Sequence, residues 1–122
     1  MVKIPERIQL ANLPTRIEKL ARLSKALKGP EMFIKRDDQT GTELSGNKVR
    51  KLEFSLKEAL DSRCDYLITC GGIQSNHCRA TAAAAVKLGM KCCLVLAGQE
   101  TSQPEGNLLI DRILGADIRF IT

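Results

Sequence analysis

The sequence predicts an α/β fold in which a parallel sheet is covered by helices. Short apolar runs typical of strands alternate with longer segments of helical periodicity, three times before a final strand. Residues 66–70 form a continuous apolar run, which is typical of a parallel strand covered on both faces. Glycine or proline separates most of these segments, and the alternation favours right-handed crossovers.

The N-terminal third is predicted to be the least regular part. Residues 1–15 are expected to be irregular, because two prolines interrupt them. A helix is predicted from Thr15, as its cap, to about residue 27, with apolar side chains at helical spacing: Ile17, Leu20, Leu23 and Leu27. Gly29-Pro30 ends this helix. A short strand over 32–34 then leads into the polar run 35–38 and a turn.

The remaining elements follow from periodicity and from glycines at their ends. They are predicted in this order: helix 47–63, strand 66–70, helix 76–88, strand 92–97, helix 106–114 and strand 118–121. The first of these helices has a single apolar stripe. The second helix carries small side chains on nearly every face, as close packing against a sheet requires. Gly89 and Gly115 stand where C-terminal caps belong.

Composition bounds the function. The 122 residues carry a net charge of +5, but the basic residues are mixed with 14 acids and lack interleaved aromatics, which argues against nucleic acid. A solvated basic surface that attracts anionic small molecules fits better. No apolar stretch can span a bilayer and no signal-peptide core is present, so we expect a cytoplasmic protein without membrane contact.

Five cysteines and a single histidine make a metal site unexpected. No two cysteines form a C-x-x-C pair, so zinc ligands are poorly supplied. We expect reduced, mostly buried thiols.

Ser45-Gly46-Asn47-Lys48 is the first segment with unusual chemistry. Its lysine falls in the opening turn of a helix, where the partial positive charge of the helix end favours a neutral amine. A neutral amine is what a Schiff-base lysine must supply. Ser45 or Asn47 could cap the helix. The alternative is a solvent-exposed lysine beside an ordinary Asn cap, and spacing alone favours that alternative.

The second segment, Gly71 to His77, is a glycine-rich turn between a buried strand and a helix. The free amides of such a helix start favour a carboxylate or phosphate. Ser75 could instead be only an N-cap, and His77 a polar surface or cap residue. No acidic residue flanks this pair, so a hydrolytic triad has little support.

Together these segments resemble a family of pyridoxal-phosphate (PLP) enzymes. Residues 44–53, LSGNKVRKLE, are similar to the PLP-lysine motif of the D-cysteine desulfhydrase/aminocyclopropane-carboxylate deaminase family. Residues 71–79, GGIQSNHCR, resemble its substrate and cofactor loop. Pro14-Thr15, residues 35–38 and residues 106–117 also match, so the resemblance covers nearly the whole chain in order.

This resemblance implies a role for each site residue. Lys48 would form the Schiff base with PLP, and Asn76 would hydrogen-bond the cofactor's ring hydroxyl. Ser75 stands at the family's candidate nucleophile or proton-relay position. The amides from Gln74 to His77 would hold the substrate carboxylate. The implied fold is that of the tryptophan-synthase β-subunit group, fold type II.

The activity implied is a PLP-dependent lyase reaction on a small amino acid. α,β-Elimination of D-cysteine to pyruvate, hydrogen sulfide and ammonia is favoured, because Ser-Asn-His rather than Ser-Asn-Gln favours the desulfhydrase branch. The alternatives are 1-aminocyclopropane-1-carboxylate (ACC) deaminase, a sulfo-lyase with a cysteate-like substrate, and a non-catalytic remnant.

Family members are more than twice as long, so we expect this chain to be the N-terminal part of such an enzyme. Residues 1–48 would belong to the large PLP domain and residues 49–122 to the smaller α/β domain. The phosphate-binding loop and the partner of the pyridine nitrogen would lie beyond Thr122. The resemblance also implies a homodimer at full length.

Overall fold

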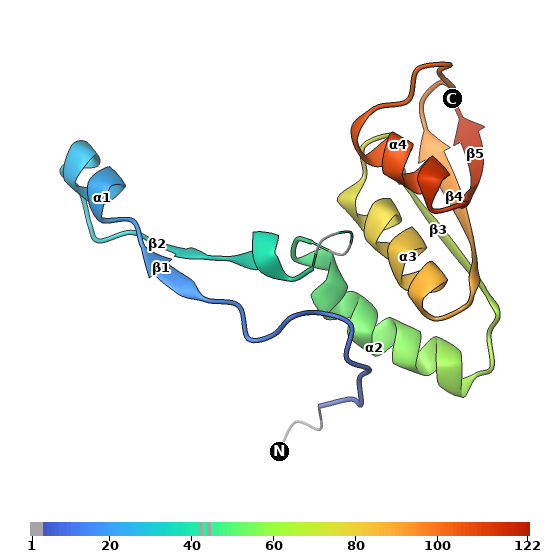
Figure 1. The fold of residues 1–122 in the computed structure, drawn as a ribbon, viewed down its shortest axis with the longest axis horizontal. Helices are drawn as coiled ribbons and strands as arrows, with labels where there is room; N and C mark the ends of the chain where they lie inside the picture. The colour runs from blue at the N-terminus through green and yellow to red at the C-terminus, as the bar shows by residue number, and fades with distance from the viewer. Residues whose placement is uncertain (1–3, 42, 44) are drawn as a thin grey trace.

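The computed structural model describes residues 4–41, 43 and 45–122 (Figure 1). Its elements are β1 Ile17–Lys19, α1 Ala21–Leu27, β2 Phe33–Lys35, a 3₁₀ turn Asp37–Gln39, α2 Lys48–Asp61, β3 Tyr66–Gly72, α3 Asn76–Lys87, β4 Lys91–Ala97, α4 Gly106–Ile113 and β5 Asp117–Ile121. The α/β class with a parallel sheet and covering helices is confirmed.

The parallel sheet is made of β3, β4 and β5, in that order. Leu67 of β3 lies opposite Cys92, and Leu94 of β4 lies opposite Ile118. The first predicted strand is not part of this sheet. It forms β2, which pairs antiparallel with β1 in a two-stranded ribbon that extends away from the sheet (Figure 1).

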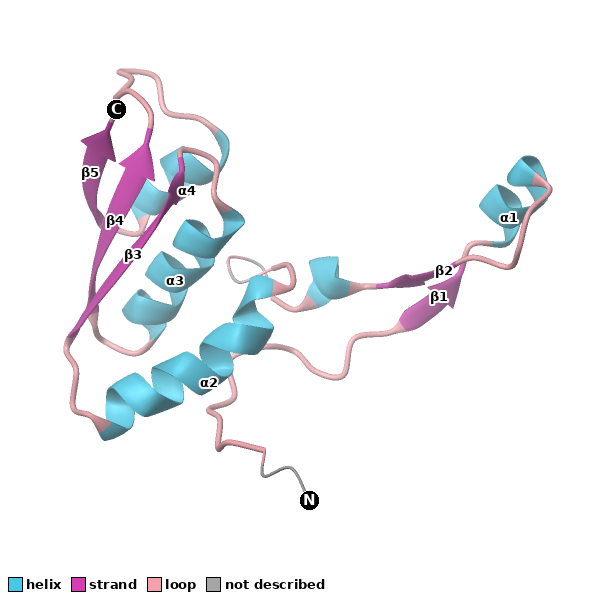
Figure 2. Ribbon diagram, turned by 180° about the vertical axis from the view of Figure 1, so that it is seen from behind, coloured by secondary structure: helices cyan, strands magenta, loops and turns pink. Residues whose placement is uncertain are grey.

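One face of the parallel sheet carries the helices, and the expectation that β3 is covered on both faces is wrong for the described residues. Figure 2 shows α3 and α4 on the same side of the three strands. Burial alternates along β3: Leu67 and Thr69 are half-buried, whereas Ile68 is 72% exposed. The continuous apolar run therefore marks a parallel strand, but not a second covering layer in this part of the chain.

The helix predicted with Thr15 as its cap begins five residues later than expected, with Leu20 at the N-cap position. Residues 17–19 form β1, and Leu20 N continues the pairing by donating to Met32 O at 2.8 Å. The apolar residues of 17–27 have helical spacing, but no residue of α1 is buried, so the helix gains no stability there from packing its apolar side chains. Strand pairing supplies the backbone with partners instead.

The other predicted helices are confirmed to within about two residues, and β3 runs two residues further than predicted, through Gly71 and Gly72. Gly89 follows α3 with φ +71°, a conformation that favours glycine. None of the described helices is long and apolar enough to cross a bilayer.

Helix α3 is the centre of the core. Every residue from Cys78 to Ala85 is buried, which is typical of a helix enclosed on all sides. Its alanines contact α2 on one side and the sheet and α4 on the other. The first cluster holds Ala80, Ala83 and Ala84 with Val49, Leu52 and Leu56. The second holds Ala82 and Ala85 with Leu94, Leu96 and Leu108.

Glu53 fixes the N-terminal segment to α2. Its carboxylate is 1% exposed and accepts hydrogen bonds from the backbone amides of Leu10 and Ala11, both at 2.9 Å. Arg7 Nη1 donates to the other carboxylate oxygen at 3.0 Å. The donors lie 42 to 46 residues away from Glu53 in the chain. The Glu53 side chain thus supplies the acceptors that a neighbouring strand or a helix would otherwise give to this irregular segment.

All five cysteines are free thiols. Cys78, Cys92 and Cys93 are buried, whereas Cys64 and Cys70 are exposed. Burial raises the pKa of Cys92 to about 11, so this thiol is protonated at neutral pH.

Candidate active site

The two segments singled out by the sequence meet at one open hollow of about 900 Å³. Ser45, Gly46 and Asn47, from the loop before α2, line one part of it. Asn76 and Arg79 of α3 line another. Leu44, the first residue of the predicted lysine motif, lies outside the described residues.

Lys48 is the first residue of α2 and is half-buried. Its Nζ donates to Asn47 Oδ1 at 3.0 Å. Asn47 occupies the N-cap position but makes no side-chain cap hydrogen bond, so the ordinary Asn cap considered from the sequence is not formed. The side chain of Asn47 instead contacts the lysine amine.

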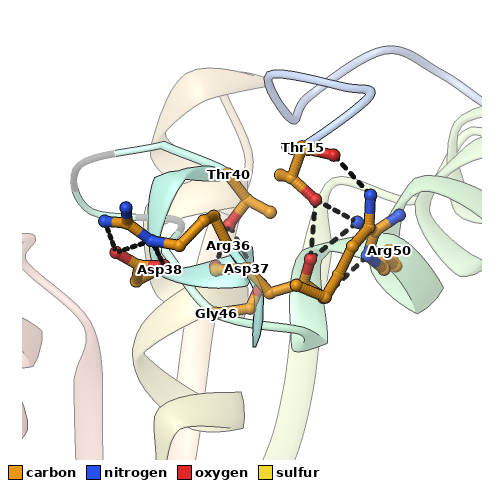
Figure 3. A network of polar contacts seen from close by, with 8 residues as sticks. Thr15, Arg36, Asp37, Asp38, Thr40, Gly46 and Arg50 are labelled. Carbon is orange, nitrogen blue, oxygen red and sulfur yellow. Dashed lines mark hydrogen bonds and ion pairs between the residues drawn. The ribbon is translucent and has the colours of Figure 1, made fainter. Parts of the chain in front are cut away.

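A small hydrogen-bonded turn holds the backbone just before Lys48 (Figure 3). Gly46 N donates to Asp37 O at 2.8 Å. The fully buried Thr40 places its hydroxyl 2.9 Å from Gly46 O and 3.1 Å from Asp37 O. The polar run 35–38, predicted only as a strand exit, therefore fixes the lysine loop.

The Asp37 side chain strengthens this connection through Arg50, two residues beyond Lys48 (Figure 3). Arg50 donates from Nη2 to Asp37 Oδ1 at 2.7 Å and from Nε to Oδ2 at 2.9 Å. Thr15 Oγ1 donates to Oδ1 at 2.9 Å. Hydrogen bonds from Arg50 and then Thr15 hold the pKa of Asp37 near 2, so the carboxylate is charged throughout the neutral range. Thr15 thus anchors this network and does not cap a helix.

Arg79 connects the lysine loop to α3. It is 5% exposed, and its guanidinium donates to Ser45 O at 2.9 Å and to Glu43 O. Sequence reasoning missed this role. The available signal was a single arginine within a run of small residues, because a buried charge in such a helix needs acceptors.

Ser75 is the N-cap of α3, as one of the two sequence interpretations proposed. Its hydroxyl accepts from Cys78 N at 3.2 Å. Gly71 allows this approach, because a Cβ at that position would lie 2.6 Å from Ser75 Oγ and 2.9 Å from Cys78 Sγ. The same hydroxyl also hydrogen-bonds the thiol of Cys78, so it contacts both the backbone amide and the side chain of that residue.

His77 faces β3, with Nε2 3.0 Å from Thr69 Oγ1. Its Nδ1 is buried and has no hydrogen-bond partner among the described residues. Burial, and then the charges of Lys51 and Lys48, lower the pKa of His77. The imidazole is therefore neutral at pH 7, with one nitrogen free to accept or donate according to its tautomer.

The loop that carries Asn76 is tied to α4 by two side-chain amides. Gln74 Oε1 accepts from Asn107 N at 2.8 Å, and Gln74 Nε2 donates to Glu105 O at 3.1 Å. Asn107 Nδ2 donates in return to Gln74 O at 2.8 Å and to Asn76 Oδ1 at 2.9 Å. We call this arrangement of Gln74, Asn76 and Asn107 the amide clasp. Local sequence patterns do not predict it, since the partners lie more than 30 residues apart.

The amide clasp requires a glycine at position 106. Gly106 has φ +56°, and a Cβ there would lie 2.5 Å from Gln74 Oε1. We expect Gly106→Ala to displace the Gln74 side chain and to lower the free energy of unfolding by about 2 kcal/mol. Urea denaturation measures this change. Gly115→Ala is the control, because Gly115 also has a positive φ, +72°, but a Cβ there meets nothing within 4 Å. An equal loss in both variants would contradict a specific role for the clasp.

Comparison with known proteins agrees with this arrangement. The family model for the pyridoxal-phosphate dependent enzyme matches residues 8–122. A mitochondrial bifunctional D-cysteine desulfhydrase/1-aminocyclopropane-1-carboxylate deaminase of Arabidopsis thaliana is 50% identical over 118 residues, covering 93% of this chain and 29% of the relative. A 1-aminocyclopropane-1-carboxylate deaminase of Methylobacterium nodulans is 46% identical over 126 residues, covering 95% and 36%.

Solved structures support the same relationship. The crystal structure of an ACC deaminase homologue superposes with a TM-score of 0.88 at 41% identity, covering 96% of this chain and 35% of that one. A fungal L-serine ammonia-lyase from Rhizomucor miehei has a TM-score of 0.69 at 18% identity, covering 88% and 32%, which shows a shared fold.

The chain therefore belongs to the pyridoxal-phosphate dependent enzymes. Its relatives within them are D-cysteine desulfhydrases and ACC deaminases, and the fold is part of fold type II. The chain spans about a third of the length of the relatives it matches.

The residues around the hollow fit the cofactor that this family implies, pyridoxal 5'-phosphate. Lys48 supplies an amine able to condense with an aldehyde, and it lies beside a loop that is held in place on both sides. The amide of Asn76 lines the hollow. The Nδ1 of His77 lies at the same helix start, but it is buried and His77 does not line the hollow. The side-chain amides of Asn47 and Asn76, which do line it, suit a polar aromatic ring.

Proposed function

We propose that this chain is the N-terminal part of a PLP-dependent lyase that performs α,β-elimination on a small amino acid, with D-cysteine as the favoured substrate. The meeting of the lysine loop and the Asn76 loop at one hollow carries this proposal. The products would be pyruvate, hydrogen sulfide and ammonia, with one water consumed.

Lys48 is the residue that would hold the cofactor. PLP, when bound, supplies the electron sink that stabilises charge developing at the substrate Cα. The amine of Lys48 would take the α-proton of the substrate on Nζ. Asn47 Oδ1, which already accepts from Nζ at 3.0 Å, would orient the amine.

The start of α3 would bind and orient the substrate. Its first-turn amides, at Asn76 and His77, point out of the helix end and suit a carboxylate. Asn76 would donate to the ring hydroxyl of the cofactor. Ser75 would donate its hydroxyl proton, or relay one, from the cap position it occupies. The Gln74 side chain is engaged with α4, so its part in substrate binding would come from its backbone.

The second candidate is ACC deaminase, which several relatives carry in their names. That substrate has no α-hydrogen, so its reaction must start in another way, with Ser75 as a possible participant. The two substrates can be told apart in the intact enzyme by their products. Both substrates give ammonia, but D-cysteine also gives sulfide and a three-carbon keto acid, whereas ACC gives a four-carbon keto acid and no sulfide. Lys48→Ala should abolish turnover of either substrate.

The first test uses this chain alone. The purified chain is mixed with PLP, reduced with borohydride and digested, and the pyridoxyl adduct is located by mass spectrometry. We expect a selective adduct on Lys48. Lys48→Arg should remove it, whereas Lys51→Arg should leave it unchanged, because Lys51 lies on the same helix but is exposed. Labelling scattered over many lysines would contradict a preorganised site.

Three further expectations stay predictions. A division at residue 48 between a large and a small domain would place Lys48 at the domain boundary. A homodimer is proposed for the full-length enzyme. A cytoplasmic location is also proposed, although the Arabidopsis relative is described as mitochondrial.

A further inference from the structure

The amide clasp determines which end of the Asn76 side chain is available to a ligand. Asn107 Nδ2 lies 2.8 Å from Gln74 O, a backbone carbonyl that can only accept. That end of the Asn107 side chain must therefore be its nitrogen. The same nitrogen lies 2.9 Å from Asn76, so the Asn76 atom that faces it must be the oxygen, Oδ1.

The rest of the clasp fixes Asn107 itself. Its backbone N–H donates to Gln74 Oε1, and Gln74 Nε2 is held in turn by Glu105 O. Every assignment in this chain of contacts rests on a backbone group whose role as donor or acceptor cannot change. If the side-chain amide of Gln74 or of Asn107 rotated by 180°, two donors or two acceptors would face each other and a hydrogen bond would be lost.

We infer that Asn107 is a positioning residue: it holds Asn76 Oδ1, and so leaves Asn76 Nδ2 to donate to an oxygen acceptor in the hollow. This inference rests on the proposed function, in which the acceptor is the ring hydroxyl oxygen of PLP. Asn107 does not touch the ligand. Asn107 has no side-chain amide hydrogen left for a ligand, because it donates both of them, to Gln74 O and to Asn76 Oδ1.

Asn107→Asp is the decisive variant. A carboxylate only accepts, so Asn76 would turn its amide to donate to it, and Oδ1 would then face the hollow. The aspartate also loses the hydrogen bond to Gln74 O, and the favourable interaction of an acid in the first turn of α4 with the helix dipole offsets part of that loss. We expect the dissociation constant of PLP to rise about tenfold.

Two matched variants separate orientation from charge. Asn12→Asp makes the same change of charge at an exposed position outside the hollow and should leave PLP binding unchanged. Asn107→Leu removes the donor without adding charge, and should weaken PLP binding about threefold. Binding by Asn107→Leu that equals that of the unsubstituted chain would overturn the inference, because the effect of aspartate would then be charge alone.

A measurement without PLP keeps the inference separate from the proposed function. In the ¹⁵N-labelled chain, the Asn76 side-chain amide protons should exchange rapidly with solvent, and Asn107→Asp should slow their exchange. The Asn12→Asp chain should keep the rapid exchange. Protected Asn76 protons in the unsubstituted chain would overturn the positioning role. Failure of the unsubstituted chain to bind PLP, with this exchange pattern intact, would count against the proposed function only.

Discussion

Replacing Glu53 with alanine is expected to lower the free energy of unfolding by about 3 kcal/mol. The substitution leaves the buried amides of Leu10 and Ala11 without their acceptor and removes the ionic partner of Arg7. Because Ile8 also donates its backbone N–H to Glu53 O, Glu53 binds the N-terminal segment through both its side chain and its backbone. Urea denaturation followed by circular dichroism measures the loss.

Glu58→Ala is the matched control, because it removes an exposed acid from the same helix. We expect a change within about 0.5 kcal/mol for it. Glu53→Gln should fall between the two, since one side-chain oxygen can still accept from the amides. Similar losses for Glu53→Ala and Glu58→Ala would show that the buried carboxylate contributes nothing beyond helix propensity.

Stability is expected to fall as the pH rises through 6, because of Asp111. This carboxyl is fully buried on α4, and neither oxygen has a hydrogen-bond partner among the described residues. Burial raises its pKa from the ordinary 3.8 to about 6, while the charge of Arg79 acts in the opposite direction. The folded chain therefore binds the proton more tightly than the unfolded chain does.

The sign follows from that difference. The contribution of Asp111 is fully present below about pH 4 and is lost as the pH rises through 6, which amounts to about 3 kcal/mol. Asp111→Asn should remove this dependence and make the chain more stable at pH 8. His77, whose pKa is lowered by burial, contributes with the opposite sign, so the informative quantity is the difference between the two chains.

Denaturation midpoints between about pH 3.5 and 8 measure this difference, because the loss takes place between the unfolded pKa of 3.8 and the folded pKa of about 6. Asp65→Asn, at an exposed position, serves as the control and should keep the pH dependence of the unsubstituted chain. Parallel pH profiles for the unsubstituted chain and Asp111→Asn would mean that the carboxyl is hydrated or paired in solution.

Local patterns sufficed for much of the fold. The apolar stripe of α2 and the terminal glycines of α3 and α4 define elements whose boundaries depend on neighbouring residues. The same reasoning failed at β1, where helical spacing competed with pairing to a strand 16 residues further on. It also failed at the uncovered face of β3, since apolar composition reports what a strand can bury and not what lies beside it.

The two loops of the candidate site were found from the sequence, but what holds them was not. Arg79, Asn107 and Glu53 each bond partners more than 30 residues away, and no spacing rule reaches so far. A usable signal does exist at three buried positions. Glu53, Arg79 and Asp111 are charged residues on helix faces that are otherwise buried, and such positions merit a search for distant partners or for unusual titration.

The enclosure of α3 has a consequence for the sequence variation that the chain can accept. Between Cys78 and Ala85, the alanines at positions 80, 83, 84 and 85 are buried against neighbouring elements, so a larger residue at one of them must push the helix sideways. Asn76 and His77 lie in the first turn of that same helix, with Ser75 as its N-cap, and would move with it. Mutational tolerance in the core and accuracy in the active site are thus one constraint, and these four positions should accept only small residues.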